Sequence, residues 1–294
     1  MVATNRDKLI KQSVIGEITS PLGGASPYLV DPDGRLSHLP GVGGITYNLV
    51  IGDPACGLAA DHVEPGVSIS NFTNFHGQPG PNRALNQYAC VGNQAYVVSG
   101  EAKGEVGRVT GKHGGIEHVL IDFPQETLEK LVIGDKIQVR AFGTGLSLNG
   151  HPQVTVMNLD PDVLEKMGVV EKEGMLQVPV THRVPARIMG SGIGQPHSFS
   201  GDYDIQLFDR ATVEEFGLDD LNIGDFVAII DAEAAFGRVY RSGGVVIGIV
   251  VHSNCVLAGH GPGVMSILSA ANGAIVPLID AGANLRRVFD RLTG

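Results

Sequence analysis

The longest stretch of the chain without Asp, Glu, Lys or Arg extends from Ser242 to Ile279. Length alone would allow such a stretch to span a membrane. It contains His252, however, and a Gly-His-Gly-Pro-Gly segment at 259–263, and these would place polar groups and a broken helix in hydrocarbon. We therefore expect a buried protein core joined by loops, and no membrane partner.

Net charge and glycine content further limit the folds and the binding partners that the chain can have. The 294 residues include 41 glycines, about twice the usual share, and the length corresponds to roughly two domains. The net charge is −10, and an acidic chain lacks the cations that neutralise nucleic-acid phosphates. The N-terminus has no apolar leader and the 3 cysteines are widely spaced, which favours a cytoplasmic protein.

Short runs rich in Val and Ile between glycine-containing turns predict that strands dominate. The expected strands are 136–142, 154–158, 226–231, 239–240 and 245–251. The expected helices are 125–131, 160–167, 211–216, 264–271 and 285–292. We predict a mainly β fold with short helices (α+β), built from two domains that resemble β-barrels or sandwiches. A charged patch at 159–178 places their boundary near residue 175, which gives domains 1–175 and 176–294, the second with a terminal helix.

The pattern Leu-x-Ile-Gly-Asp occurs three times, at 49–53, 131–135 and 221–225. Its glycine permits a tight turn with positive φ, and its aspartate can accept hydrogen bonds from nearby backbone N–H groups. Two interpretations stay open: a duplicated half-domain, or a turn that recurs before strands.

Two clusters of polar residues indicate a metal site. In a strand, His62 and Glu64 would share a face, which suits a divalent metal or an acid–base pair. Asp202 and Asp204 would also share a face, and neighbouring carboxylates favour a cation between them. We expect a divalent ion, with zinc as the candidate, bound by His62, Asp202, Asp204 and His252. Polar turns are the alternative interpretation of both clusters.

Further residues offer catalytic groups. The Gly-His-Gly-Pro-Gly segment precedes an expected helix, and N–H groups at such a turn can stabilise an oxyanion. Histidine and glutamate would transfer protons, while lysine at a hairpin tip, or arginine, would stabilise negative charge. Cys255 offers a nucleophile, although a free cysteine is more often a small buried hydrophobe. The residues expected to act in catalysis are Glu64, His260, Lys112 and Arg238.

An asparagine-rich loop at 71–87 has amide side chains that suit a neutral polar ligand. A surface loop whose asparagines cap turns is the alternative. Small residues after Asp231 would let a ligand approach the backbone, unless that carboxylate simply pairs with Arg238. The residues expected to bind a small polar molecule are Asn71, Asn74, His76, Arg83, His113, Asp231, Gly261 and Gly263.

A prokaryotic family known as domain of unknown function 4438 is similar to the chain in three segments. They are ADHVEPGVSI at 60–69, GRVTGKHGGIEHVLIDF at 107–123 and IGDFVAIIDAEAAFGRVYRSGGVVIGIVVHSNCVLAGHGPGVMSI at 223–267. This resemblance spans most of the chain. It implies a β-rich protein with N- and C-terminal parts, and it implies no activity.

A local resemblance, limited to 201–204 and 231–237, connects the chain with the acetamidase/formamidase family. That resemblance implies a β-rich hydrolase of small amides with a divalent metal. The chain has Glu233 near the position where that family usually has a histidine.

These features favour a metal-assisted enzyme that hydrolyses an amide or related C–N bond of a small polar molecule. A non-catalytic small-molecule-binding or scaffold protein is the alternative, because it would explain the asparagines and glycines equally well. An RNA-associated barrel is a third interpretation that the net charge disfavours. A β-rich chain leaves strand edges exposed, so we also expect a homo-oligomer.

Overall fold

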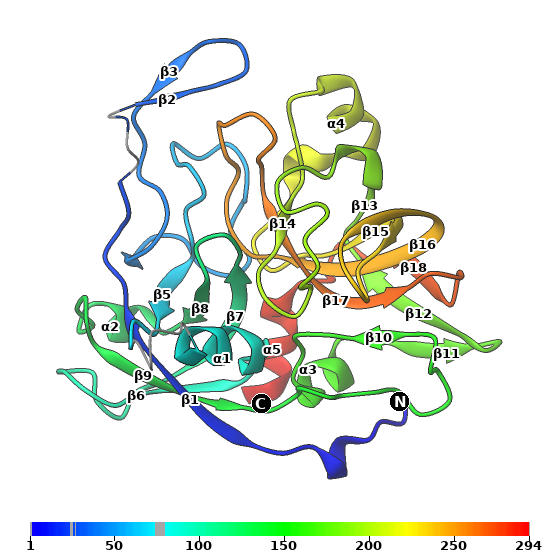
Figure 1. The fold of residues 1–294 in the computed structure, drawn as a ribbon, viewed down its shortest axis with the longest axis horizontal. Helices are drawn as coiled ribbons and strands as arrows, with labels where there is room; N and C mark the ends of the chain where they lie inside the picture. The colour runs from blue at the N-terminus through cyan, green and yellow to red at the C-terminus, as the bar shows by residue number, and fades with distance from the viewer. Residues whose placement is uncertain (1, 24–25, 27, 74–79, 294) are drawn as a thin grey trace.

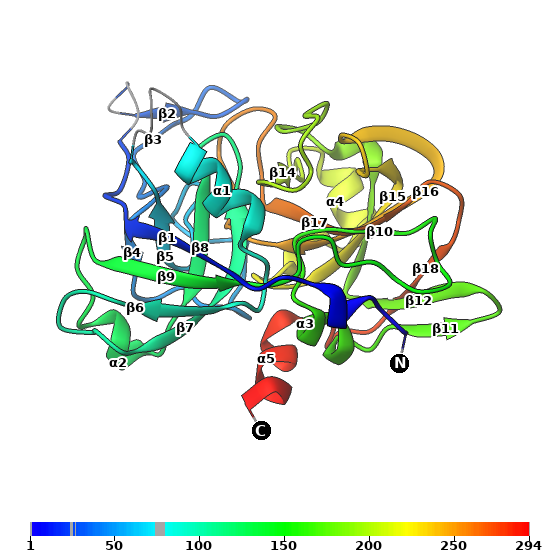
Figure 2. The ribbon, with the colours of Figure 1, turned by 60° about the horizontal axis from the view of Figure 1, so that its bottom comes forward.

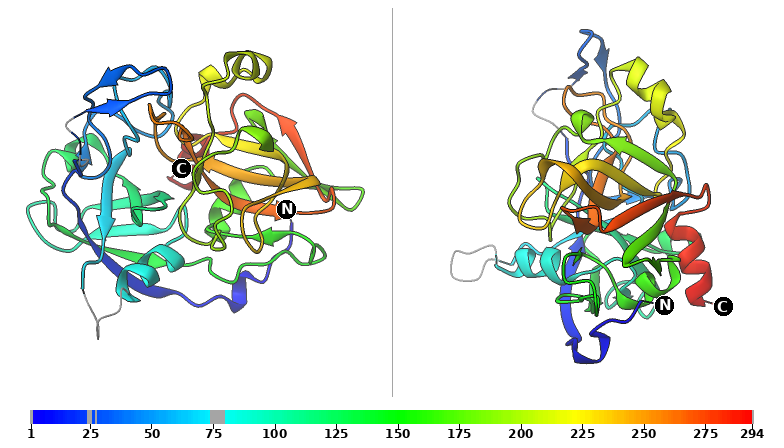
Figure 3. Two further views of the ribbon diagram at one scale, coloured as in Figure 1. Left: turned by 45° about the horizontal axis from the view of Figure 1, so that its top comes forward. Right: turned by 90° about the vertical axis from the view of Figure 1, so that its right-hand side faces the viewer.

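A computed structural model describes residues 2–23, 26, 28–73 and 80–293. It confirms the mainly β fold with short helices. Two halves lie side by side in Figure 1, in Figure 2 and in the left view of Figure 3, with the C-terminal helix α5 below their junction in Figure 2. Within the described ranges, no helix is both long and apolar enough to cross a membrane.

The first half is a closed β-barrel. Its strands pair in the order β1-β9-β6-β7-β8-β5, a pairing of β1 with β5 closes the ring, and β4 extends it at β5. The strands are β1 (Gln12–Ile18), β4 (Ile45–Thr46), β5 (Gly66–Ser70), β6 (Gln94–Val97), β7 (Val106–His113), β8 (His118–Asp122) and β9 (Lys136–Ala141). Buried side chains such as Ile69, Val109 and Val139 fill the interior. Outside the barrel, β2 (Leu29–Val30) pairs with β3 (Leu36–Ser37).

The second half contains two sheets. In the larger sheet the order is β10-β17-β16-β15-β13, with β14 paired to β17, and in the smaller sheet it is β11-β12-β18. The larger sheet comprises β10 (Thr155–Val156), β13 (His182–Pro185), β14 (Tyr203–Asp204), β15 (Phe226–Glu233), β16 (Val239–Val250) and β17 (Gly263–Ala270). The smaller sheet comprises β11 (Val170–Lys172), β12 (Met175–Val180) and β18 (Ile275–Ile279). One apolar core joins this half to the outer side of the barrel, where Val91 and Leu120 are fully buried.

Short helices connect the strands. They are α1 (Gly80–Tyr88), α2 (Gln125–Leu128), α3 (Pro161–Lys166), α4 (Arg210–Phe216) and α5 (Leu285–Thr293), with 3₁₀ turns η1 (Arg6–Lys8), η2 (Ala186–Ile188) and η3 (Leu218–Asp220). Four of the expected helices are confirmed, within a few residues at their ends. The side chain of Asp160 caps α3 by accepting a hydrogen bond from the N–H of Asp162.

Two expectations about local structure are wrong. Residues 264–270 belong to strand β17 instead of a helix, and every residue of β17 is buried. An apolar run that is buried on both faces has no periodicity that separates strand from helix. His62 and Glu64 do not share the face of a strand, because His62 has a φ of 53° and residues 61–65 form an irregular loop before β5.

The three Leu-x-Ile-Gly-Asp segments form the same turn. Their glycines have φ of 97°, 91° and 86°, and each aspartate accepts a hydrogen bond from the N–H three residues earlier. The glycines are Gly52, Gly134 and Gly224, and the aspartates are Asp53, Asp135 and Asp225. The pattern therefore encodes a local turn that recurs in both halves.

Candidate metal centre

Glycines let the two halves approach closely beside the end of β7. A Cβ at Gly111 would lie 2.4 Å from Cγ1 of Val251, and a Cβ at Gly201 would lie 2.5 Å from Cα of Gly114. Because these positions carry no side chain, His113 at the end of β7 lies against His252, which follows β16. Their ring centroids are 4.2 Å apart.

A cavity of about 410 Å³ opens at this junction. Both halves contribute to its wall, so residues far apart in sequence face one space. From the barrel half come Val42, His62 and the β7–β8 hairpin, 113–117. From the second half come Ser191, Gly192, Gln195, His197, Ser200, Asp202, Asp204, Arg238 and His260.

Three imidazoles beside the cavity share one arrangement, in which Nδ1 faces an oxygen atom. The distances are 2.6 Å from His113 to Glu64, 3.2 Å from His62 to Asp61, and 2.8 Å from His252 to the carbonyl of Ser253. Such outer contacts fix the orientation of a ring and leave Nε2 for another partner. Histidines that bind metals show this pattern almost always.

The first group of converging atoms belongs to His113, Asp202 and His252, whose nitrogen and oxygen atoms suited to holding a metal all lie within 4.8 Å of one another. Nε2 of His252 is 2.8 Å from Oδ2 of Asp202. Both atoms are buried, and among the described residues neither has a partner in hydrogen-bonding geometry. Nδ1 of a neutral His252 donates to Ser253, so its Nε2 would present a lone pair to the carboxylate. A cation between the two atoms would remove this repulsion.

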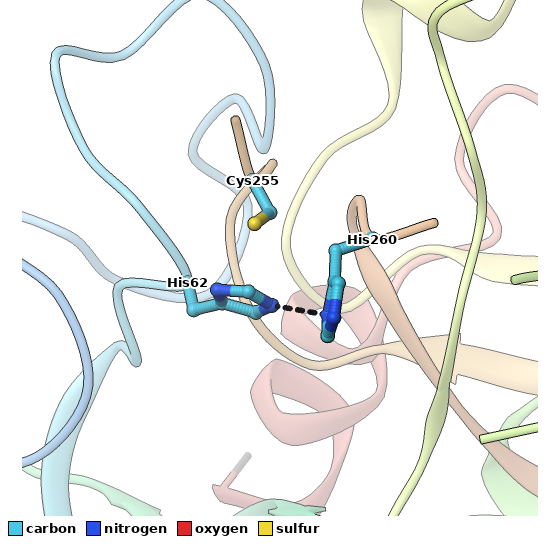
Figure 4. A group of neighbouring side chains, drawn as sticks. All are labelled: His62, Cys255 and His260. Carbon is cyan, nitrogen blue, oxygen red and sulfur yellow. Dashed lines mark hydrogen bonds between the residues drawn. The ribbon is translucent and has the colours of Figure 1, made fainter. Parts of the chain in front are cut away.

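The second group lies next to the first and contains His62, His260 and Cys255 (Figure 4). Nε2 of His62 is 3.1 Å from Nδ1 of His260. Oδ2 of Asp204 is 3.1 Å from that same nitrogen and 3.6 Å from Nε2 of His62. All these side chains are buried except that of His260, which is 34% exposed.

The charges suit cation binding. Burial alone would raise the pKa of Asp202, but its interactions with the imidazoles of His252 and His113 hold that pKa below its usual value. For Asp204, burial is likewise outweighed by hydrogen bonds from His260 and His62, so its pKa is also low. Both carboxylates are therefore ionised at neutral pH. Burial raises the pKa of the Cys255 thiol, which disfavours the nucleophilic role that the sequence allowed.

The expected metal ligands His62, Asp202, Asp204 and His252 thus lie together. Of the four residues expected to act in catalysis, only two line the cavity. His260 and Arg238 line the cavity, and the buried Arg238 donates to the carbonyl groups of Gly192 and Ser200. Glu64 is 1% exposed and lies behind His113, away from the cavity.

Lys112 is not at a hairpin tip, because β7 continues through His113. Its side chain is fully buried, donates to Asn158 and to the carbonyl of Phe199, and has a pKa lowered to about 8 by burial. The expected oxyanion turn is also wrong, because a strand follows it and the N–H of Gly261 faces Asp204 at 3.3 Å.

The residues expected to bind a ligand are scattered. His113 lines the main cavity, whereas Asn71 lines a separate one of about 100 Å³. Arg83 is exposed on α1. Asp231 accepts from the N–H of Gly243 and does not pair with Arg238. Asn74 and His76 lie outside the described residues.

Two residues that contact side chains of the candidate metal centre were not selected from the sequence. His118 pairs across the β7–β8 hairpin with His113, and its Nδ1 is 3.0 Å from Glu64. Asp61 orients His62. The hairpin register would have placed both histidines together, whereas nothing in the sequence indicates that Asp61 turns back toward its neighbour.

Comparisons with known proteins agree with this architecture. The two family models described as domain of unknown function (DUF4438), N-terminal and C-terminal, match residues 28–165 and 166–289. The crystal structure of TM1086 is 47% identical in sequence, covers 99% of both chains and superposes with a TM-score of 0.91. No curated protein matches. The chain therefore belongs to the DUF4438 family.

Proposed function

We propose that the protein is a metal-dependent hydrolase whose first ion is held by His113, Asp202 and His252. The observation that carries this proposal is the shared orientation of the imidazoles, each with Nδ1 fixed and Nε2 directed at its neighbours. Two nitrogens and one carboxylate oxygen are a donor set typical of catalytic zinc, which keeps a fourth position open. Relative to the sequence analysis, His113 replaces His62 and Asp204 in this set.

A bound ion would supply Lewis acidity, by polarising a carbonyl group or by lowering the pKa of a water molecule. Side chains of the protein would stabilise charge and transfer protons. Arg238, in the cavity wall, would hold negative charge on the substrate. His197 lines the cavity, is exposed and makes no hydrogen bond or ion pair with the described part of the chain. In this proposal, His197 would protonate a leaving nitrogen.

The substrate class follows from the size and chemistry of the cavity. A volume of about 410 Å³ accommodates a small molecule, and the imidazole, carboxylate, hydroxyl and guanidinium groups in the wall favour one with polar groups. The local resemblance of 201–204 and 231–237 to the acetamidase/formamidase family supports an amide or related C–N bond. Histidine and carboxylate groups from both halves meet in one cavity, which an enzyme requires and a scaffold protein does not.

Metal analysis of the purified protein tests the proposal first. We expect stoichiometric divalent metal by ICP-MS, and loss of the first ion in His252→Ala. The loaded protein should then release ammonia or an amine from a panel of small amides, and His252→Ala should not. A wild-type protein that neither contains nor takes up metal would contradict the proposal and favour a non-catalytic binding protein.

A further inference from the structure

Asp204 faces both groups of metal-binding atoms at once. Its Oδ1 is 3.8 Å from Nε2 of His252, in the first group. Its Oδ2 is 3.1 Å from Nδ1 of His260, in the second group. Strand pairing fixes this position, because Asp204 ends β14 and lies opposite Gly263 of β17. A carboxylate with one oxygen toward each of two sites is the usual bridge in two-metal centres, whose ions lie about 3.5–4 Å apart.

The spacing of the second group matches a metal ion closely. Three atoms, Nε2 of His62, Nδ1 of His260 and Oδ2 of Asp204, are separated by 3.1, 3.1 and 3.6 Å. A tetrahedral zinc ion with bonds of about 2.0–2.1 Å would keep its ligand atoms about 3.3–3.4 Å apart. The three atoms are therefore already at the separations that one ion requires.

Hydrogen bonding alone explains this group poorly. Nδ1 of His260 lies 3.1 Å from both Nε2 of His62 and Oδ2 of Asp204, so a single N–H can satisfy only one of them. Nδ1 of His62 faces Asp61, which orients the ring as Glu64 orients His113. The metal-binding atoms of His62, His260 and Cys255 lie within 4.8 Å of one another, so sulfur is available as a fourth, soft donor.

We propose that the protein holds a second divalent ion between His62, His260 and Asp204, with Cys255 beside it and Asp204 bridging to the first ion. This inference rests on the proposed function, because Asp204 can bridge only if the first site is occupied. It assigns His260 to metal binding instead of the proton transfer expected from the sequence. The nitrogen and sulfur donors favour zinc over magnesium or calcium.

The test counts ions in the full-length protein. Metal-free wild-type protein, His260→Ala and His252→Ala are each titrated with Zn²⁺ and Co²⁺, and bound metal is measured by ICP-MS after desalting. His260→Ala is the variant of choice because its side chain is partly exposed and its loss should leave the fold intact. Circular dichroism checks folding, and His197→Ala, at the same cavity but outside both groups, is the matched control.

We expect two equivalents in the wild type and in His197→Ala, and one equivalent in His260→Ala. One equivalent in the wild type, unchanged in His260→Ala and lost in His252→Ala, would overturn the second site and leave the proposed function standing. No uptake by the wild type would overturn both. As an independent measurement, protein loaded with Mn²⁺ should give an exchange-coupled electron paramagnetic resonance spectrum that His260→Ala converts to that of an isolated ion. An isolated-ion spectrum in the wild type would contradict the bridge.

Discussion

The carboxylate of Glu64 lies 2.6 Å from Nδ1 of His113 and is buried completely behind it. The same carboxylate accepts from the N–H of Gly43 and from the hydroxyl of Ser68, and it faces His118. Hydrogen bonds from His113 and His118 hold the pKa of Glu64 well below its usual range although burial opposes this. Glu64 is thus a fixed anion that orients the ring of His113.

Replacing Glu64 by Gln should weaken the first metal site without removing a ligand. Glutamine keeps the shape, but its amide nitrogen donates and so cannot accept from a histidine. Loss of such an outer contact typically lowers metal affinity by about 10–100-fold. Competition with a chromophoric chelator measures the change, and Glu117→Gln, at the cavity wall, is the control. Equal affinities in Glu64→Gln and wild type would remove the positioning role.

Gly263 should be irreplaceable for metal binding. A Cβ at this position would lie 1.9 Å from Oδ2 of Asp202 and 2.2 Å from Nε2 of His252, and both side chains are buried and have little room to move. We expect Gly263→Ala to lose the first ion, as measured by ICP-MS. Gly23→Ala is the control, because among the described residues, its own atoms and its chain neighbours aside, no heavy atom lies within 4 Å of a Cβ there. A fully loaded Gly263→Ala protein would show that the site lies elsewhere.

Removal of metal should destabilise the protein. An ion present at 1,000 times its Kd stabilises the folded state by about 4 kcal/mol, which corresponds to roughly 7 °C in Tm for a protein of this size. Asp202 and Asp204 both approach Nε2 of His252, so the metal-free centre also carries like charges side by side. Calorimetry with and without a chelator measures the shift, and His252→Ala should respond less. An identical Tm in chelator would argue against a bound ion.

The sequence predicted the five strand runs that became β9, β10, β15 and β16, and four of the five expected helices, because these depend on local composition. By residue type it also selected four side chains that the fold brings together, those of His62, Asp202, Asp204 and His252. It did not predict how the groups divide between two sets, since that depends on which loops face each other across the junction. The glycines illustrate this difference between local and long-range information. Gly111 and Gly201 allow the halves to touch, yet nothing local separates them from the glycines that merely permit turns.

The prediction of a helix at 264–271 was wrong for a related reason. Its apolar residues are buried on both faces as β17, between β16 and the short strands β10 and β14, and only the neighbouring strands reveal this. With a helix there, Gly263 would have seemed a helix-start residue. As a strand residue opposite Asp204, it leaves room for the ligands instead.

Asp122, at the end of β8 and remote from the cavity, should make stability depend on pH. Burial raises its pKa to about 6, although the charge of Arg286 opposes the shift, and its Oδ1 has no hydrogen-bond partner among the described residues. The folded protein therefore binds more protons at this group than the unfolded chain between about pH 4 and pH 6. In that window the free energy of unfolding falls as pH rises.

Replacing Asp122 by Asn removes this titration and should raise stability at pH 7. A pKa raised by about two units corresponds to roughly 3 kcal/mol as an upper limit, so the variant should exceed the wild type by up to that amount at pH 7 and approach it near pH 4. Denaturant unfolding at pH 4, 5, 6 and 7 measures the difference, and Asp33→Asn, on an exposed turn, is the control. A difference that stayed constant with pH would mean that Asp122 is already ionised in the folded protein at pH 4.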